Sequence, residues 1–256
     1  MKTEAPPARV GTSGWSYRWW WGRFYPRDIR PGDWLAYYAR HFSTVELNAS
    51  FYRLPPPERF ARWRDAVPDG FLFAVKAPRL ITHLKKLHDC AGPLNEFLAA
   101  AEHLRDRLGP LLFQLPPSFG IDLKRLEDFL RALPRPLPND AVPVFEFRHA
   151  SWFTAQTFAL LDSHQAAFCV HDHHDLNVPH VTTARTAYWR FHGPPRAARG
   201  ECYGQQRLAS AARAILTATP ANAAIFAFFN NDANACAPAD AQALQQLLLQ
   251  PTANRA

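Results

Sequence analysis

The stretch Val142-Pro-Val-Phe-Glu-Phe-Arg148 places two charged residues at the end of an otherwise apolar run. Side chains of a strand alternate between its two faces, so Glu146 and Arg148 share one face while Phe145 and Phe147 share the other. A strand that is buried on both faces is normally apolar throughout, and charged side chains in it need partners or a ligand. The stretch therefore predicts a buried parallel strand with a polar end.

Seven further apolar runs of this kind alternate along the chain with segments of helical period. This alternation is typical of βα units around a parallel sheet. We expect strands over residues 9–15, 44–50, 71–77, 110–115, 142–148, 166–172, 187–192 and 223–230. Helices are expected over residues 34–41, 57–67, 94–108, 122–133, 154–164, 207–217 and 240–249, with no obvious helix in 176–186.

Eight such units predict an α/β fold of the (β/α)₈ TIM-barrel type, with an irregular or missing helix between the sixth and seventh strands. The length of 256 residues fits one domain over residues 1–256, with a loose tail from about residue 250. Asp33 and Asp122 are the expected caps of two helices, and Pro57 fits a first helical position. The boundaries of the predicted helices are thus supported by local chemistry.

Composition narrows the classes of protein that remain. The sequence holds no apolar run of membrane-spanning length, and its charged, proline-containing beginning does not read as a secretory signal, so we expect a soluble cytoplasmic protein without a membrane partner. The four cysteines stand singly, and we expect reduced thiols at Cys90, Cys169, Cys202 and Cys236. A net charge of +7 favours anionic ligands, whether phosphate, carboxylate or nucleic acid.

Polar side chains recur near the carboxyl ends of the predicted strands. In a closed barrel these ends meet at one mouth, which is where active sites of this architecture lie. We therefore predict a polar pocket there, with Glu46, Glu146 and His192 as catalytic residues. The predicted substrate-binding residues are Asn48, Tyr52, Lys76, Gln114, Arg148, Asp172, Arg190, Asn230 and Asn231.

The favoured hypothesis is an enzyme, a hydrolase, isomerase or lyase, that acts on a small anionic or phosphorylated substrate. Arginine guanidinium groups suit a bidentate clamp on an anion, and the two glutamates would serve as acid and base while the histidine moves a proton. Loops after the last two strands hold phosphate in many barrels. Here they contain Gly193, Arg196, Arg199, Gly200 and the turn Asn230-Asn231-Asp232.

Three alternatives stay open. The charged residues could form an internal ion-pair network, Glu146 with Arg148 or Lys76 with Glu46, that only plugs the barrel. A divalent metal could bind among Glu46, Glu146, Asp172 and His192, although no motif requires a cofactor and the run 171–175, His-Asp-His-His-Asp, lacks helical ligand spacing. The aromatic stretch 15–25 could stack nucleic-acid bases, but it fits a lid or a cap on the first helix better.

Several motifs occur in a fixed order across nearly the whole chain. They are Gly11–Trp15, Val45–Tyr52, Lys76–Pro78, Ile81–His83, Gln114–Phe119, Glu146–His149, Arg190–Gly193 and Phe229–Asp232. In that order they resemble the YecE-like family, a bacterial family of unknown function. The resemblance implies a (β/α)₈-type fold and an activity that is not assigned. The loops after residues 203 and 232 depart from the family pattern, which leaves the substrate open.

Overall fold

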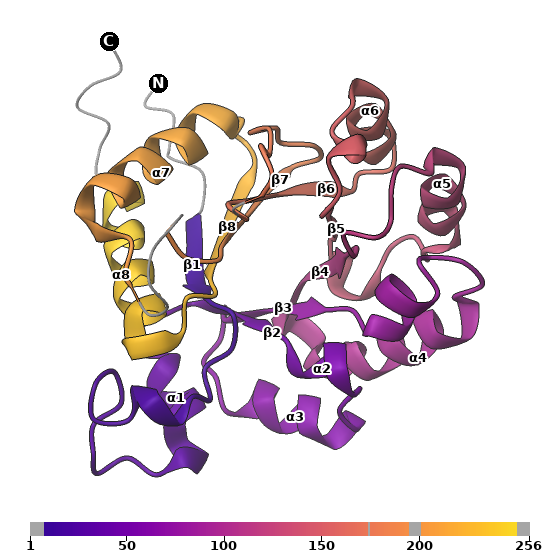
Figure 1. Cartoon of the computed structure of the whole chain (residues 1–256). Helices are drawn as coiled ribbons and strands as arrows, with labels where there is room; N and C mark the ends of the chain where they lie inside the picture. The colour runs from indigo at the N-terminus through magenta and orange to yellow at the C-terminus, as the bar shows by residue number, and fades with distance from the viewer. Residues whose placement is uncertain (1–7, 174, 195–200, 250–256) are drawn as a thin grey trace.

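The computed structural model describes residues 8–173, 175–194 and 201–249. Eight parallel strands form one sheet in the order β1-β8-β7-β6-β5-β4-β3-β2. The strands are β1 (Ala8–Thr12), β2 (Thr44–Leu47), β3 (Leu72–Lys76), β4 (Leu108–Gln114), β5 (Pro143–Glu146), β6 (Ala167–His171), β7 (Thr186–Phe191) and β8 (Ala224–Phe229). The strands surround a common axis with the helices outside them, so the predicted barrel fold is confirmed (Figure 1).

The barrel closes where β1 and β2, which stand at the two ends of the strand order, come together. A single bridge joins Ser13 to Glu46, and the Gly14 backbone N–H donates to the Glu46 carbonyl over 2.8 Å. Glycine is required at position 11 of this seam, because a Cβ there would lie 2.3 Å from the Thr44 carbonyl oxygen. The close approach of β1 to β2 brings the end of β1 next to Glu46.

The helices cover the outside of the barrel except at one place. They are α1 (Trp34–Tyr38), α2 (Ala49–Tyr52), α3 (Pro57–Asp65), α4 (Ala91–Ala101), α5 (Leu123–Ala132), α6 (Ala155–Ser163), α7 (Gly204–Ala218) and α8 (Cys236–Leu249). Between β6 and β7 the described residues form no helix, as the sequence predicted, and Figure 1 shows only loop there.

Two boundaries differ from the predictions in ways that affect the site. β2 ends at Leu47, not Ser50, because the backbone of Asn48 turns to φ −101° and ψ −9° and α2 follows. Asn48 and Glu46 were expected on one strand face, and that expectation is wrong because Asn48 is not in the strand. The helix expected up to Leu108 ends earlier, because a 3₁₀ segment over Glu102–Arg107 leads into β4.

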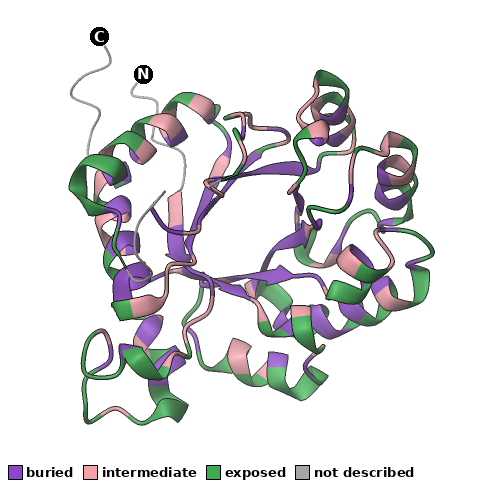
Figure 2. Cartoon of the chain, viewed as in Figure 1, coloured by how far each residue is buried: buried purple, intermediate pink, exposed green. Residues whose placement is uncertain are grey.

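The core has two layers on opposite sides of the sheet. Large side chains such as Phe145, Phe147 and Trp189 pack outward under the helices. A smaller cluster fills the inside of the barrel with Ala74, Leu112, Val144, Ala167, Cys169, Tyr188, Phe226 and Phe228. Figure 2 shows buried residues along the strands and on the helix faces turned toward them. The inner layer supports whatever lies above it at the mouth.

Of the two expected aspartate caps, only one makes the capping bond. The Asp122 carboxylate accepts from the Arg125 backbone N–H at the start of α5, whereas Asp33 makes no side-chain bond to α1 because it ends a 3₁₀ turn. We expect Asp122→Ala to lower the free energy of unfolding by about 1 kcal/mol. Asp33→Ala should change it by less than about 0.5 kcal/mol. Urea unfolding followed by circular dichroism measures both, and equal effects would contradict the assignment of the cap.

One expectation about the cysteines is wrong. Cys202 and Cys236 form a disulfide, with their Cα atoms 4.9 Å apart, because the loop before α7 lies beside the first residue of α8. Cys90 and Cys169 are free and buried, as expected. Among the described residues, no helix has the length and apolar character needed to cross a membrane.

Candidate functional site

Two buried carboxylates share one arginine at the carboxyl ends of the strands. Arg190 of β7 donates from Nη2 to Glu46 Oε1 over 2.8 Å and from Nη1 to Glu146 Oε2 over 2.6 Å. Glu46 is the last residue but one of β2 and Glu146 ends β5, and both are 0% exposed. Residues 144 positions apart in the chain thus meet inside the barrel because parallel strands bring their ends together.

A second arginine completes this arrangement. Arg148 Nε donates to Glu146 Oε1, and its Nη2 lies 2.8 Å from His192 Nε2. We call Glu46, Glu146, Arg148 and Arg190 the ion-pair cluster. The Glu146–Arg148 pair that the sequence offered is present, whereas the Lys76–Glu46 pair is replaced by Arg190–Glu46.

Three neutral donors that the sequence analysis did not assign to the site also contact the carboxylates. Ser13 Oγ and Tyr188 OH each donate to Glu46 over 2.7 Å, and the Cys169 thiol lies 3.7 Å from Glu146 Oε2. Burial, and then the adjacent carboxylates, raise the pKa of Tyr188 and of Cys169 well above their ordinary values. Both groups therefore stay protonated and act as hydrogen-bond donors.

The chemical state of Glu146 follows from two opposing effects. Burial favours the neutral acid, but Arg148 and Arg190 outweigh it and hold the pKa of Glu146 well below its ordinary value. Glu146 is therefore ionised at neutral pH, with both oxygens accepting hydrogen bonds. This environment suits a carboxylate that fixes two guanidinium groups, and it leaves the predicted catalytic roles of Glu46 and Glu146 as predictions.

Lys76, the last residue of β3, is a further cation at the mouth. It is 8% exposed, and its Nζ lies 3.9 Å from the ring centroid of Phe51. Within the part of the chain that the structure describes, it forms no ion pair. Burial, followed by repulsion from Arg190, lowers the pKa of Lys76 to about 8. Among the described residues, the two arginines of the ion-pair cluster balance its two glutamates, and Lys76 adds a third positive charge beside them.

The two histidines beside the cluster are neutral. Burial and Arg190 hold the pKa of His192 well below its ordinary value, and burial also lowers the pKa of His171. His171 donates from Nε2 to the Phe147 carbonyl over 2.9 Å, which fixes its tautomer. The side-chain nitrogen of Asn230 lies 3.3 Å from His192 Nδ1. His192 therefore joins Asn230 to Arg148, and its role in proton transfer stays a prediction.

Two other predicted residues hold the loops around the mouth. Asp172 accepts from the His192 backbone N–H over 2.7 Å and from the Tyr203 hydroxyl. Asn231 donates to Asp240 of α8 over 2.8 Å. Sequence reasoning could not separate these contacts from substrate contacts, because the partners come from loops whose path it does not define.

Of the remaining predicted binding residues, Asn48 and Tyr52 lie apart from the ion-pair cluster, whereas Gln114 lies beside it. Asn48 and Tyr52 line a cavity beside the mouth, and Gln114 ends β4 next to Glu146 in the strand register. The expected anion contacts Arg196, Arg199 and Gly200 fall outside the described residues, as does His174. Among the residues that are described, no group of three or more His, Cys, Asp and Glu side chains could hold a metal ion.

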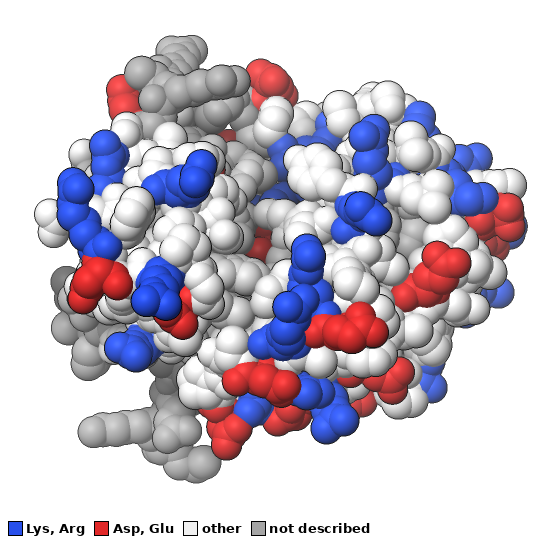
Figure 3. All heavy atoms as spheres, turned by 90° about the horizontal axis from the view of Figure 1, so that it is seen from below, with Lys and Arg blue, Asp and Glu red and all other residues white. Residues whose placement is uncertain are grey.

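The aromatic stretch after β1 is largely packed into the molecule. Trp20 and Tyr25 are fully buried, and Tyr25 stacks on Trp34 at the start of α1. Trp19 and Trp20 both donate from Nε1 to the Asp232 carbonyl, which ties this stretch to the loop after β8. In the described part of the face shown in Figure 3, basic side chains are interspersed with acidic ones and form no continuous band.

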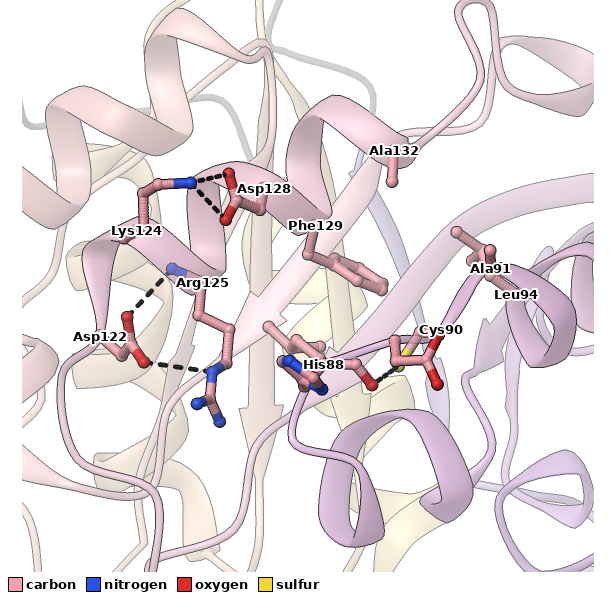
Figure 4. Close-up of a pocket in the computed structure, with 12 residues that line it drawn as sticks. His88, Cys90, Ala91, Leu94, Asp122, Lys124, Arg125, Asp128, Phe129 and Ala132 are labelled. Carbon is pink, nitrogen blue, oxygen red and sulfur yellow. Dashed lines mark hydrogen bonds and ion pairs between the residues drawn. The ribbon is translucent and has the colours of Figure 1, made fainter.

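A separate cavity of about 490 Å³ lies between α4 and α5. Its charged side chains are already paired, Lys124 with Asp128 and Arg125 with Asp122, and the Cys90 thiol donates to the His88 carbonyl (Figure 4). Burial raises the pKa of Cys90, which keeps the thiol protonated. This cavity therefore presents no unmet charge to a ligand.

Comparison with known proteins agrees with this architecture. The UPF0759 protein YecE of Escherichia coli (strain K12) is 38% identical over 146 residues, which are 56% of this chain and 49% of that protein, so the chain spans about half the length of this relative. The UPF0759 protein YunF of Bacillus subtilis (strain 168) is 28% identical over 200 residues, which are 72% of this chain and 69% of that protein.

A solved structure is similar over nearly the whole chain. The crystal structure of a DUF72 family protein from Thermotoga maritima has a TM-score of 0.84 at 29% identity, and the match covers 95% of this chain and 100% of that one. Residues 9–255 also match the family model described as "Protein of unknown function DUF72". The chain therefore belongs to the DUF72 family of proteins of unknown function.

Proposed function

We propose that this chain is an enzyme that binds a small anionic or phosphorylated substrate at the carboxyl-terminal mouth of the barrel. The observation that carries the proposal is Lys76, a buried cation that forms no ion pair with any described residue. A buried charge without a partner is costly, and such groups concentrate at functional sites. The anionic part of a substrate would supply the missing partner.

The neighbours of Lys76 suit this role. Arg148 is 9% exposed and is fixed by Glu146, so its guanidinium is held in place before a ligand arrives. His192 and Asn230 offer neutral polar atoms beside it. In this proposal Lys76 binds the anion, Arg148 orients it, and Glu146 acts by fixing both arginines of the ion-pair cluster.

We expect a small phosphate ester to bind and be converted at pH 7, with affinity falling as Lys76 loses its proton above about pH 8. Once Lys76 is mostly deprotonated, the affinity should fall by about tenfold for each further pH unit. A panel of glycerol 3-phosphate, ribose 5-phosphate and phosphoenolpyruvate can be followed by ³¹P NMR, which reports binding and conversion in one sample. Lys76→Met should lose both.

The matched control is Lys124→Met, because Lys124 is an exposed lysine already paired with Asp128. It should bind and convert the same ester as the unchanged protein. Affinity that survives Lys76→Met, or that does not depend on pH between 7 and about 10, would remove Lys76 from the site.

A further inference from the structure

A second cavity, of about 630 Å³, opens beside the mouth between the loop after β1, α2 and α3. We call it the side cavity. Its volume is within the range of ligand pockets in proteins. No residue of the ion-pair cluster lines it, and Lys76 does not line it either. The residues used below are Trp15, Asn48, Tyr52, Arg59, Arg62 and Trp63.

Aromatic rings form much of the wall. Trp15 and Trp63 meet edge to face with ring centroids 5.5 Å apart. Tyr52 at the border of the cavity is 77% exposed, so its ring is accessible to a ligand. Flat aromatic surfaces of this kind bind planar rings by stacking, and they do so for any nucleobase.

The side cavity also carries charge that the protein leaves unmet. Arg59 and Arg62 lie three residues apart on α3 and therefore on one face of this helix. Both are exposed, and neither forms an ion pair with another described residue. The cavity between α4 and α5 differs in this respect, because Lys124 and Arg125 are both paired there (Figure 4). Two unpaired guanidinium groups in one wall suit a phosphate.

A third observation concerns Asn48, the residue that the turn after β2 removes from the strand. Its Oδ1 is buried and has no hydrogen-bond partner among the residues that the structure describes. Buried polar atoms normally have partners, and Asn48 lines the side cavity, so a ligand there that donates a hydrogen bond would supply the missing partner. An N–H group on a planar ring would satisfy it.

From these three features we infer that the side cavity binds a nucleoside monophosphate. The base would stack on the tryptophan and tyrosine rings, with an N–H group donating to Asn48. The phosphate would lie between Arg59 and Arg62. The inference does not depend on the reaction proposed for the mouth, because it rests on binding by other residues.

Isothermal titration calorimetry tests the inference directly with AMP, GMP, CMP and UMP, and with adenosine and inorganic phosphate as partial ligands. At least one nucleotide should bind more tightly than either partial ligand. The double variant Arg59→Ala/Arg62→Ala should weaken binding of that nucleotide by at least about tenfold and leave adenosine unchanged. Tyr52→Ala should weaken nucleotide and adenosine alike. All three side chains are exposed, so these variants should fold.

Arg40→Ala is the matched control, because Arg40 is an exposed arginine outside the side cavity. It should bind the nucleotide with unchanged affinity. The inference is overturned if no nucleotide binds at millimolar concentration, if inorganic phosphate binds as tightly as the nucleotide, or if Arg40→Ala weakens binding as much as the double variant does. If Lys76→Met loses turnover but still binds the nucleotide, the proposed function of the mouth is supported and the inference about the side cavity is not affected.

Discussion

Arg190→Met is expected to lower the free energy of unfolding by about 3–5 kcal/mol at pH 7, because it leaves buried carboxylates without the cation they share. Arg190 is 2% exposed, and its two ion pairs reach Glu46 and Glu146 at the centre of the barrel. Methionine fills a similar space but supplies no charge. Chemical denaturation followed by circular dichroism measures the loss.

The dependence of this loss on pH has a definite sign. The folded-state pKa of Glu146 is lowered, so its stabilisation is present above the pKa of the unfolded chain and disappears as the pH falls through the folded-state value. Without Arg190 that pKa rises, and ionised Glu146 becomes a cost. The difference in stability between the unchanged protein and Arg190→Met should therefore be larger at pH 7 than at pH 4.

Two further variants separate a buried charge effect from a general loss of packing. Adding Glu46→Gln to Arg190→Met should restore part of the stability, because one of the unpaired charges is removed. Arg131→Met removes an exposed arginine that is paired with Glu127, and it should cost less than about 1 kcal/mol. If Arg190→Met costs no more than Arg131→Met, the ion-pair cluster does not stabilise the barrel.

The barrel could be predicted from the sequence because segments with the helical period and short apolar runs typical of buried strands both occur in it. Helical segments alternate with short apolar runs, and all eight expected runs became strands of one parallel sheet. The missing helix before β7 was also visible, since residues 176–186 lack helical period. The end of β2 was not visible, because apolar and polar residues continue to alternate over residues 45–51, which is compatible with a strand. There the backbone turns into α2, and tertiary packing overrides local preference.

The alternation of side chains between the two faces of a strand was also enough to predict that Glu46, Glu146 and Arg190 meet. The same alternation could have found Tyr188, which lies two residues before Arg190 on the same face of β7. Ser13 could not be found in this way, since its contact with Glu46 depends on how the barrel closes. The disulfide was missed for a similar reason, because it joins Cys202 of the loop before α7 to Cys236 at the start of α8, and sequence does not define the path of that loop.

The second large effect that we expect is a gain in stability. Lys76→Met should raise the free energy of unfolding by about 3 kcal/mol at pH 7, since a difference of one pKa unit corresponds to about 1.4 kcal/mol. Burial, and then Arg190, lower the pKa of Lys76 from 10.5 to about 8, so the folded protein holds this charge at a cost. Methionine removes the charge and keeps most of the apolar side chain over Phe51. Stability gained together with lost anion binding is what a residue kept for function should show.

The pH dependence of this gain distinguishes charge from packing. Between about pH 8 and 10.5 the unfolded chain keeps the lysine proton while the folded protein has lost it, so the unchanged protein becomes more stable as pH rises through this window. Lys76→Met lacks that increase, and the gap between the two proteins should close toward the upper end of the window. Lys124→Met should show no comparable gap at any pH. If the difference in stability between the two proteins stays constant from pH 7 to about 10, methionine only packs better than lysine. The charge of Lys76 would then not destabilise the folded protein, and the argument that it needs an anion would fail.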